Sequence, residues 1–322
     1  MLTVLIIGCG SIAGSFDAQR PPAARPITHA GAFTGHGGFK LTACVDPDEA
    51  KREQFKARWG VVRSFRSMDE VTASGLQFDV ISICSPTSAH HDDALAALAM
   101  RPRLLFCEKP ICPTVAEATD LVQRCHDAGV LLAVNHNRRW DPTVVALQDK
   151  LACGDWGALR SATGYYNKGV LNNGSHLIDL LHCLVGPLAL RHAGAPIHDF
   201  WPTDPSIPAL LTTGVGAPVM LTCGYASDYS LFELHLVLEH GVIAMEDGGL
   251  RWREQRAEPS PEFNGYTALG IGTLADGQYL LSMSNAAANI YDAVTSGATL
   301  ASTGETALLA HRLCSQIRDQ AA

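Results

Sequence analysis

The chain has 322 residues, of which 47% are hydrophobic and 17% are charged, so it is long enough to bury the cores of two domains. Its net charge of −8 and its scattered Lys and Arg residues argue against nucleic acid or an anionic membrane as a partner. The start lacks a basic leader and no apolar run reaches the length of a membrane span, which predicts a cytoplasmic protein. The ten cysteines form no CxxC pair and the thirteen histidines form no HExxH, so we expect no metal.

Short apolar runs alternate with helical patterns in the first 136 residues. The predicted strands are 2–7, 39–45, 79–84, 104–107 and 131–135, and the predicted helices include 89–100 and 115–128. Continuous apolar runs are typical of strands buried on both faces of a parallel sheet, so residues 1–136 are predicted to form an α/β domain, a doubly wound Rossmann sheet. Thr114 and Glu117 predict a capping box. The stretch 21–38, rich in Pro and Gly, is expected to be an enlarged connection.

From residue 137 onward the pattern changes. Apolar and polar residues alternate over 231–239, as in a half-exposed antiparallel strand. Further strands are expected at 219–223, 242–245 and 250–254, and helices at 279–296 and 304–319, the last opened by Ser302 and Glu305. Residues 137–322 are therefore predicted to form a substrate-binding α+β domain with a large open, mostly antiparallel sheet, whose last helix either stays with it or packs on the first domain. An uncovered sheet face also predicts a homodimer or homotetramer.

A glycine-rich turn follows the first strand, and Gly8, Gly10, Ser11, Ile12 and Ala13 are its candidate cofactor-binding residues. Such a turn lets the backbone approach a pyrophosphate, which rests on N–H groups at the start of a helix. The second strand ends in Asp46, whose carboxylate would accept hydrogen bonds from the adenosine ribose and repel a 2′-phosphate. This favours NAD over NADP, although Lys51 and Arg52 remain available to a phosphate.

Polar residues also follow the third and fourth strands. Ser85, Pro86 and His90 would lie at the carboxyl edge of the sheet, where open α/β sheets bind ligands. His90 either lies along the nicotinamide or pyrophosphate or starts an exposed helix. Glu108 and Lys109 come directly after the fourth strand, and a strand end partly desolvates an ammonium. Taken alone, this step fits a reactive lysine and an ordinary surface lysine equally well.

Five segments in this order resemble the glucose–fructose oxidoreductase/inositol dehydrogenase (Gfo/Idh/MocA) family. They are GCGSIAG at 8–14, ICSPTSAH at 83–90, CEKPI at 107–111, NRRWDP at 137–142 and GVLNNGSHLID at 169–179. The resemblance covers nearly the whole chain and implies hydride transfer between NAD or NADP and a sugar or cyclitol carbon. It also implies that Lys109 and His176 are the catalytic pair, and that Glu108 and Lys109 line the cofactor.

The segment around His176 supports this resemblance. A helix over 175–184 would bury its four leucines and leave His176 and Asp179 together on another face. An imidazole can accept a hydroxyl proton near neutral pH, while Lys109 would stabilise the developing alkoxide. Asp179 either orients His176, binds a substrate hydroxyl or is simply solvated.

One residue departs from the family pattern. Many relatives have an aspartate four residues before the histidine, whereas this chain has Asn172 followed by Asn173, and an amide cannot relay a proton. Lys109 and His176 then share the acid–base work, or the substrate binds in a different pose. Lys168 either attracts an anionic substrate such as a nucleotide sugar or is a solvated loop lysine.

The family geometry adds Arg138 and Tyr166 as candidates for the substrate cleft. The favoured function is an NAD-dependent dehydrogenase or reductase acting on a hydroxyl or keto carbon of a sugar, a nucleotide sugar included. One alternative is a glycosidase that retains NAD and turns over without net change in NADH absorbance. Another is a cofactor-sensing regulator without catalysis, in which Lys109 and His176 would be replaceable.

Overall fold

The computed structural model describes residues 1–18, 20–21 and 24–321. Contacts between Cα atoms divide the chain into two compact units, one made of Met1–Trp140 and Leu280–Leu308 and the other of Asp141–Tyr279 and Leu309–Ala322. The sequence predicted a boundary after residue 136. The division differs because a helical segment near the C-terminus belongs to the first unit, a partition that no local sequence pattern reveals.

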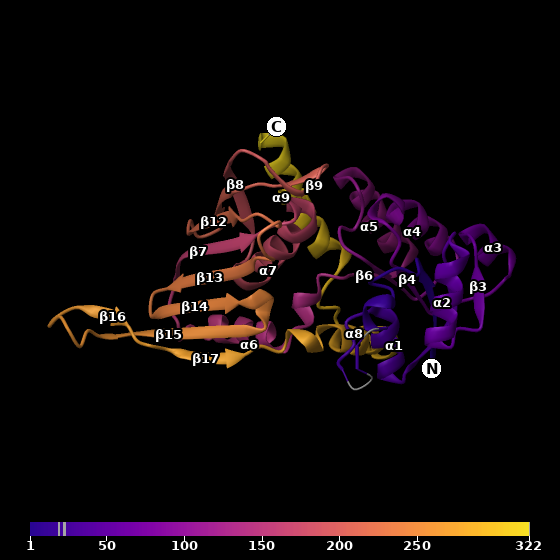
Figure 1. The fold of residues 1–322 in the computed structure, drawn as a ribbon, viewed down its shortest axis with the longest axis horizontal. Coiled ribbons are helices and arrows are strands. Elements are labelled where there is room, and N and C mark those ends of the chain that lie inside the picture. The colour runs from indigo at the N-terminus through magenta and orange to yellow at the C-terminus, as the bar shows by residue number, and fades with distance from the viewer. Residues whose placement is uncertain (19, 22–23, 322) are drawn as a thin grey trace. The chain divides into compact units, whose positions relative to one another are not determined.

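The first unit is built on a parallel sheet of six strands in the order β3-β2-β1-β4-β5-β6. Figure 1 labels β3, β4 and β6 of this sheet. The strands are β1 Leu2–Ile7, β2 Phe39–Val45, β3 Arg63–Phe65, β4 Val80–Ile83, β5 Leu104–Cys107 and β6 Leu131–Val134. Alternate side chains of β1 enter two different cores, Val4 and Ile6 one of them and Leu5 and Ile7 the other. Both faces of the sheet are therefore buried, which explains the continuous apolar runs in the sequence.

Helices cover both faces of this sheet. They are α1 His29–His36, α2 Glu49–Trp59, α3 Met68–Ala73, α4 His90–Ala99, α5 Val115–Ala128 and α8 Ser282–Ser296, with short 3₁₀ turns at Ser15–Asp17, Thr87–Ala89 and Asn137–Trp140. Phe33 of α1, Phe55 of α2 and Ile290 of α8 share one core. Ala97 of α4 and Leu121 of α5 belong to the other. The predicted doubly wound architecture is confirmed.

Two helix starts test the predicted caps. At α5 the Thr114 and Glu117 capping box is present as predicted. At α9, Gly304–Ala321, the reciprocal pair is instead Thr303 and Thr306, each side chain accepting a hydrogen bond from the backbone N–H of the other at 3.3 and 3.0 Å. The Ser302 hydroxyl, expected to cap this helix, donates to the carbonyl of Val134 in β6.

The connection after β1 is more ordered than expected. Residues 29–36 of the predicted enlarged connection form α1. The glycines themselves are followed by a turn and the 3₁₀ segment Ser15–Asp17, not by an α-helix. Two backbone N–H groups, those of Ile27 and Thr28, donate to the Asp17 carboxylate at 3.1–3.2 Å and fix the start of α1. Pro22 and Ala23 of the predicted connection lie outside the described residues.

The second unit contains a sheet of nine strands in the order β16-β15-β14-β13-β7-β12-β11-β8, with β17 also paired to β15. Its strands are β7 Leu159–Tyr166, β8 Leu188–Ala193, β11 Ala209–Thr213, β12 Pro218–Cys223, β13 Phe232–Leu238, β14 Gly241–Glu246, β15 Arg251–Pro259, β16 Thr267–Leu269 and β17 Thr273–Asp276. A separate hairpin joins β9 Ile197–Trp201 to β10 Asp204–Ser206. Only β7 and β12 pair in parallel, so the sheet is mixed and mostly antiparallel, as predicted.

One face of this sheet is covered and the other is not. Helix α6 (Pro142–Ala152), helix α7 (Ser175–Val185) and the second part of α9 contribute Leu147, Leu181 and Ile317 to the core of the unit. The alternation of β13 is confirmed, since its apolar side chains enter that core. On the opposite face Met220 and Val237 are exposed. Within the described residues no helix combines the length and the apolar character needed to cross a membrane.

Candidate active-site residues of the two units

The glycine turn after β1 is shaped by two glycines with different surroundings. Gly8 has a φ of +87°, and a Cβ atom there would lie 2.6 Å from the backbone nitrogen of Ser85, so no other residue fits. A Cβ on Gly10 would meet nothing within 4 Å. Gly8 is therefore required by the packing of β1 against the loop after β4, whereas Gly10 leaves room beside the backbone.

The backbone N–H groups of this turn have few acceptors within the protein. The N–H of Cys9 donates to Asp46 Oδ2 at 2.8 Å. Within the described residues, no protein acceptor receives the N–H groups of Ser11, Ile12 or Ala13. Successive N–H groups without acceptors are a typical binding place for a phosphate.

Asp46 lies at the end of β2 and organises this turn. Its second carboxylate oxygen, Oδ1, accepts the N–H of Asp48 at 2.9 Å, and its carbonyl accepts a hydrogen bond from Arg52. Each carboxylate oxygen keeps a second lone pair for a ribose hydroxyl. A small cavity of about 80 Å³ lies beside the turn, between Cys9 and the Lys51 and Arg58 side chains.

His90 lies at the buried start of α4. Its ring is 1% exposed, with Nδ1 2.8 Å from the carbonyl of Pro110 and Nε2 2.9 Å from the carbonyl of Ser85. His90 is therefore buried and joins the loops after β4 and β5, so it does not start an exposed helix. Its place along the nicotinamide or pyrophosphate stays a prediction. Its neighbours Ser85 and Pro86 remain at the carboxyl edge of the sheet.

Glu108 is the centre of a buried polar cluster at the end of β5. Its Oε1 lies 2.8 Å from His29 Nε2 and 2.5 Å from Asn135 Nδ2, and its Oε2 accepts the backbone N–H of Lys109 at 3.2 Å. The ring of His29 also contacts Ser82 Oγ through Nδ1 at 2.7 Å. The Lys109–Pro110 peptide bond is cis, and the Lys109 side chain is half-buried.

The charges of this cluster are paired. Burial alone would lower the pKa of His29, but the neighbouring Cys84 and Glu108 outweigh it and raise that pKa to about 10. Burial would raise the pKa of Glu108, yet its bond to His29 and the His29 charge hold the Glu108 pKa below its usual value. At neutral pH the two side chains therefore form a buried ion pair.

Sequence reasoning missed His29, Ser82 and Asn135. His29 lies inside the stretch expected to be irregular, and Ser82 lies inside an apolar run. Only Asn135 could have been found from the sequence, because it comes directly after β6 and β6 pairs with β5. The carboxyl ends of neighbouring parallel strands meet at one edge of the sheet, so Asn135 could have been expected near Glu108.

His176 belongs to the second unit and follows an unusual helical segment. A π-helix over Gly169–Gly174 leads into α7, where His176 is half-buried one turn before Asp179. The four leucines of α7 are buried as predicted. Asp179 is 1% exposed, so the interpretation as a solvated residue is wrong.

The π-helix is held by the β9–β10 hairpin. Asp204 accepts the backbone N–H groups of Leu171 and Asn172, both at 2.9 Å, and Asp199 accepts the N–H of Lys168 at 2.8 Å. The Asn172 side chain donates to the carbonyl of Lys168 at 3.0 Å, so this amide also stabilises the segment. The Lys168 ammonium lies 5.5 Å from the centre of the Phe200 ring.

Tyr166 does not line a cleft. It is fully buried, and its hydroxyl both donates to the carbonyl of Ile207 at 2.7 Å and accepts the N–H of Ile207 at 2.9 Å. Burial raises the pKa of this hydroxyl well above its usual value. The predicted substrate role is corrected to a structural one. Arg138 is buried in the 3₁₀ turn after β6, in the first unit, and Asn173 is half-buried in the π-helix.

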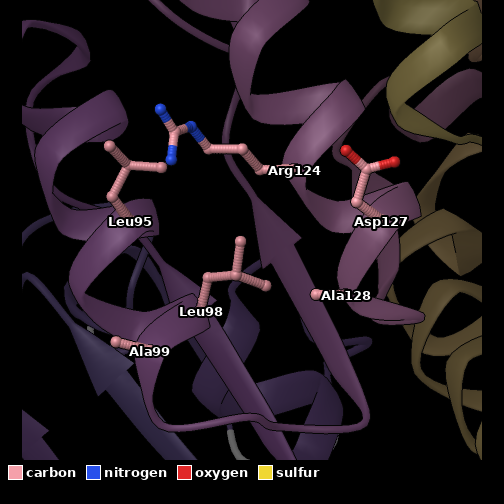
Figure 2. Close-up of a pocket in the computed structure, with 6 residues that line it drawn as sticks. All are labelled: Leu95, Leu98, Ala99, Arg124, Asp127 and Ala128. Atoms are coloured by element: carbon pink, nitrogen blue, oxygen red, sulfur yellow. The ribbon is translucent and has the colours of Figure 1, made fainter.

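A groove between α4 and α5 lies away from the glycine turn. It has a volume of about 490 Å³, and Figure 2 shows Leu95 and Leu98 of α4 facing Arg124 and Asp127 of α5 around it. These residues belong to the C-terminal halves of the two helices. Such helix ends lie at the edge of a parallel sheet opposite the ligand-binding edge, so the groove is separate from the glycine turn.

The first unit matches a known family. A family model described as an oxidoreductase family with an NAD-binding Rossmann fold covers residues 2–136, which include the glycine turn, Asp46 and Lys109. Residues 2–136 are therefore similar to the NAD-binding Rossmann domain of the Gfo/Idh/MocA oxidoreductase family.

Two curated proteins of similar sequence illustrate how far the relationship extends. D-apiose dehydrogenase of Paraburkholderia graminis is 27% identical over 218 residues, which cover 62% of this chain and 57% of that protein. Inositol 2-dehydrogenase of Rhizobium meliloti is 29% identical over 135 residues, which cover 42% of this chain and 40% of that protein. The chain thus spans about half the length of these relatives.

The similarity of fold to solved structures extends over the residues of both units. The crystal structure of the WlbA dehydrogenase from Bordetella pertussis, in complex with NADH and UDP-GlcNAcA, aligns with a TM-score of 0.77. The alignment covers 99% of this chain and 96% of that chain at 19% identity, so it establishes the fold alone.

Proposed function

We propose that the chain is an NAD-dependent dehydrogenase or reductase that transfers a hydride between nicotinamide and a hydroxyl or keto carbon of a sugar or cyclitol. The observation that carries the proposal is the position of Lys109 at the carboxyl end of β5. The same edge of the same sheet holds the glycine turn after β1 and Asp46 after β2. Open α/β sheets bind dinucleotides at this edge.

The residues of the first unit fit a dinucleotide. The N–H groups of Ser11, Ile12 and Ala13 would hold the pyrophosphate, and Gly10 leaves space for its approach. The Asp46 carboxylate, already oriented by Cys9 and Asp48, would accept the ribose hydroxyls and repel a 2′-phosphate. Nicotinamide, when bound, supplies the hydride acceptor or donor.

Lys109 and His176 would carry the proton chemistry. In the oxidative direction His176 would take the hydroxyl proton of the substrate, and nicotinamide, when bound, would accept the hydride from the carbon as the C=O bond forms. The Lys109 ammonium donates a hydrogen bond to the same oxygen and stabilises the alkoxide as it develops. In reduction Lys109 polarises the carbonyl and His176 returns the proton.

The substrate class is proposed from the relatives and from one surface of the second unit. The relatives named above act on D-apiose and inositol, and WlbA binds UDP-GlcNAcA. Lys168 lies over the ring of Phe200, which is 51% exposed. An ammonium beside an exposed aromatic ring suits a nucleotide sugar, which has a negative pyrophosphate and faces that stack on aromatic rings.

The proposal is tested by titrating the protein with NADH and NADPH and then screening aldoses, inositols and UDP-sugars for a change in NADH absorbance. We expect NADH to bind more tightly and at least one sugar to be turned over. Lys109→Met should reduce turnover roughly 100- to 10,000-fold, whereas Lys40→Met, on an exposed position of β2, should not. Tighter binding of NADPH would refute the role of Asp46, and binding of neither cofactor would refute the function.

A further inference from the structure

His29 is a fully buried histidine to which the proposed reaction assigns no role. It is the first residue of α1 and is 0% exposed. Its backbone N–H donates to the carbonyl of Ile12 in the glycine turn at 3.1 Å, and the N–H of Ala30 donates to the carbonyl of Ala13 at 2.9 Å. The helix start is thus bonded directly to the residues proposed to hold the pyrophosphate.

Asp17 prevents this helix start from moving independently of the turn. Its carboxylate accepts the N–H groups of Ile27 and Thr28 and also the hydroxyl of Thr28, the last at 2.6 Å. The Thr28 hydroxyl in turn accepts the N–H of Gly31. A displacement of the glycine turn is therefore transmitted to the backbone of His29.

The side chain of His29 reaches the opposite side of the site. Its Nε2 and the amide of Asn135 both bind Glu108 Oε1, and this fixes the rotation of the carboxylate. The other oxygen, Oε2, is then held on the backbone N–H of Lys109. One buried ring thus connects the glycine turn with the lysine at the end of β5.

We propose that His29 is a positioning residue that couples occupancy of the glycine turn to the placement and reactivity of Lys109 through Glu108. This inference rests on the proposed function, because it assigns Lys109 and the glycine turn to one dinucleotide site. A purely structural histidine would stabilise the first unit, but a ligand at the glycine turn would then leave Lys109 unchanged. The two roles differ in what a ligand at the turn does to Lys109.

The groups that face the imidazole come from three strands. β4 contributes Ser82 and is followed by Cys84, β5 contributes Phe106 and is followed by Glu108, and Asn135 follows β6. Glu108 is the acidic residue of this set. Glu108 Oε2 is bonded to the backbone N–H of Lys109, so a carboxylate that is held more firmly also restrains the lysine. A restrained lysine reaches an acylating reagent less often, so coupling should appear as slower acylation of Lys109.

The probe is ADP, which has the adenosine and the pyrophosphate but no nicotinamide ribose and so does not itself cover Lys109. The rate of acylation of Lys109 is measured by peptide mass spectrometry with and without saturating ADP. In the unsubstituted protein we expect ADP to slow acylation about 5-fold, the lower end of measured couplings between sites. In His29→Gln the ADP effect should fall below about 2-fold, although ADP still binds.

Two further variants support the test. His36→Gln changes a histidine on the same helix that contacts Phe39 and Tyr291 instead of Glu108, and it should keep the full ADP effect. Ser82→Ala removes the hydroxyl on the other side of the His29 ring and should reduce the effect to about 2- to 3-fold. Ser82→Ala decides the question if His29→Gln does not fold.

The outcomes separate the inference from the function. ADP and NADH failing to bind the unsubstituted protein would refute the proposed function. Binding of ADP without any change in Lys109 acylation would overturn the inference alone. The same conclusion would follow if the His29 or Ser82 variant kept the full ADP effect.

Discussion

At the scale of single residues, the buried pair of His29 and Glu108 makes stability depend on pH. The folded-state pKa of His29 is about 10, above its ordinary value of 6.5. The stability that this group contributes is thus fully present below pH 6.5 and is lost as the pH rises toward 10. Glu108 has a lowered pKa, so its contribution is present above its ordinary range and is lost in acid.

His29→Gln should remove this dependence. We expect the unsubstituted protein to lose roughly 3 kcal/mol of unfolding free energy, relative to the variant, between pH 6.5 and pH 9.5. Chemical denaturation of both proteins at the two pH values measures the difference. A difference that stays constant across this interval would contradict the assignment of a charged His29.

The sequence predicted the type of most site residues but not their contacts. Gly8, Asp46 and Lys109 follow strands whose apolar runs are continuous, so their places at the carboxyl edge were predictable. Tyr166 was a candidate on the family geometry and His90 on its place after β4, yet both are buried by contacts with residues distant in sequence. Such contacts are set by tertiary packing, which a single sequence does not reveal.

At the scale of elements, helix α1 was not predicted from the sequence. Its eight residues include two glycines, each of which costs about 1 kcal/mol in a helix, so the segment has little helical propensity of its own. The helix forms because Asp17 and Thr28 satisfy the N–H groups at its start and because Phe33 is buried in the core. Five of the six strands in the first sheet were predicted, because burial on both faces dictates their composition, whereas the short edge strand β3 was not.

Asp17→Ala should therefore loosen the start of α1 and the glycine turn together. We expect the unfolding free energy to fall by about 1–3 kcal/mol, because buried N–H groups lose their acceptor. Amide hydrogen exchange in α1 should become faster and NADH affinity should decrease. Asp69→Ala, at an exposed position in α3, is the matched control. Unchanged exchange in α1 would show that Asp17 does not hold this helix.

At the scale of the whole molecule, the open face of the nine-stranded sheet carries exposed apolar side chains. Leu210, Met220 and Val237 are 36–43% exposed there, and each lies between two residues of the same strand that are buried in the core. Exposed apolar groups on neighbouring strands are typical of subunit contacts. The proposal of a homodimer or homotetramer through this sheet rests on that face.

Charged residues on this face should break the assembly. We expect the unsubstituted protein to sediment as a dimer or tetramer, and the double variant Met220→Lys, Val237→Lys to sediment as a smaller species with unchanged NADH affinity. Val62→Lys, at an exposed apolar position of the first unit, should have no effect on size. A monomeric unsubstituted protein at micromolar concentration would rule out this interface.

The central claim is hydride transfer to a sugar carbon with Lys109 at the reacting oxygen. It is tested most directly by incubating the protein with a keto sugar and NADH that carries deuterium at the transferring carbon, followed by mass spectrometry of the product. We predict one deuterium per product molecule, bound to carbon, and a rate roughly 100- to 10,000-fold lower in Lys109→Met. Product without deuterium, or an undiminished rate in that variant, would contradict the account.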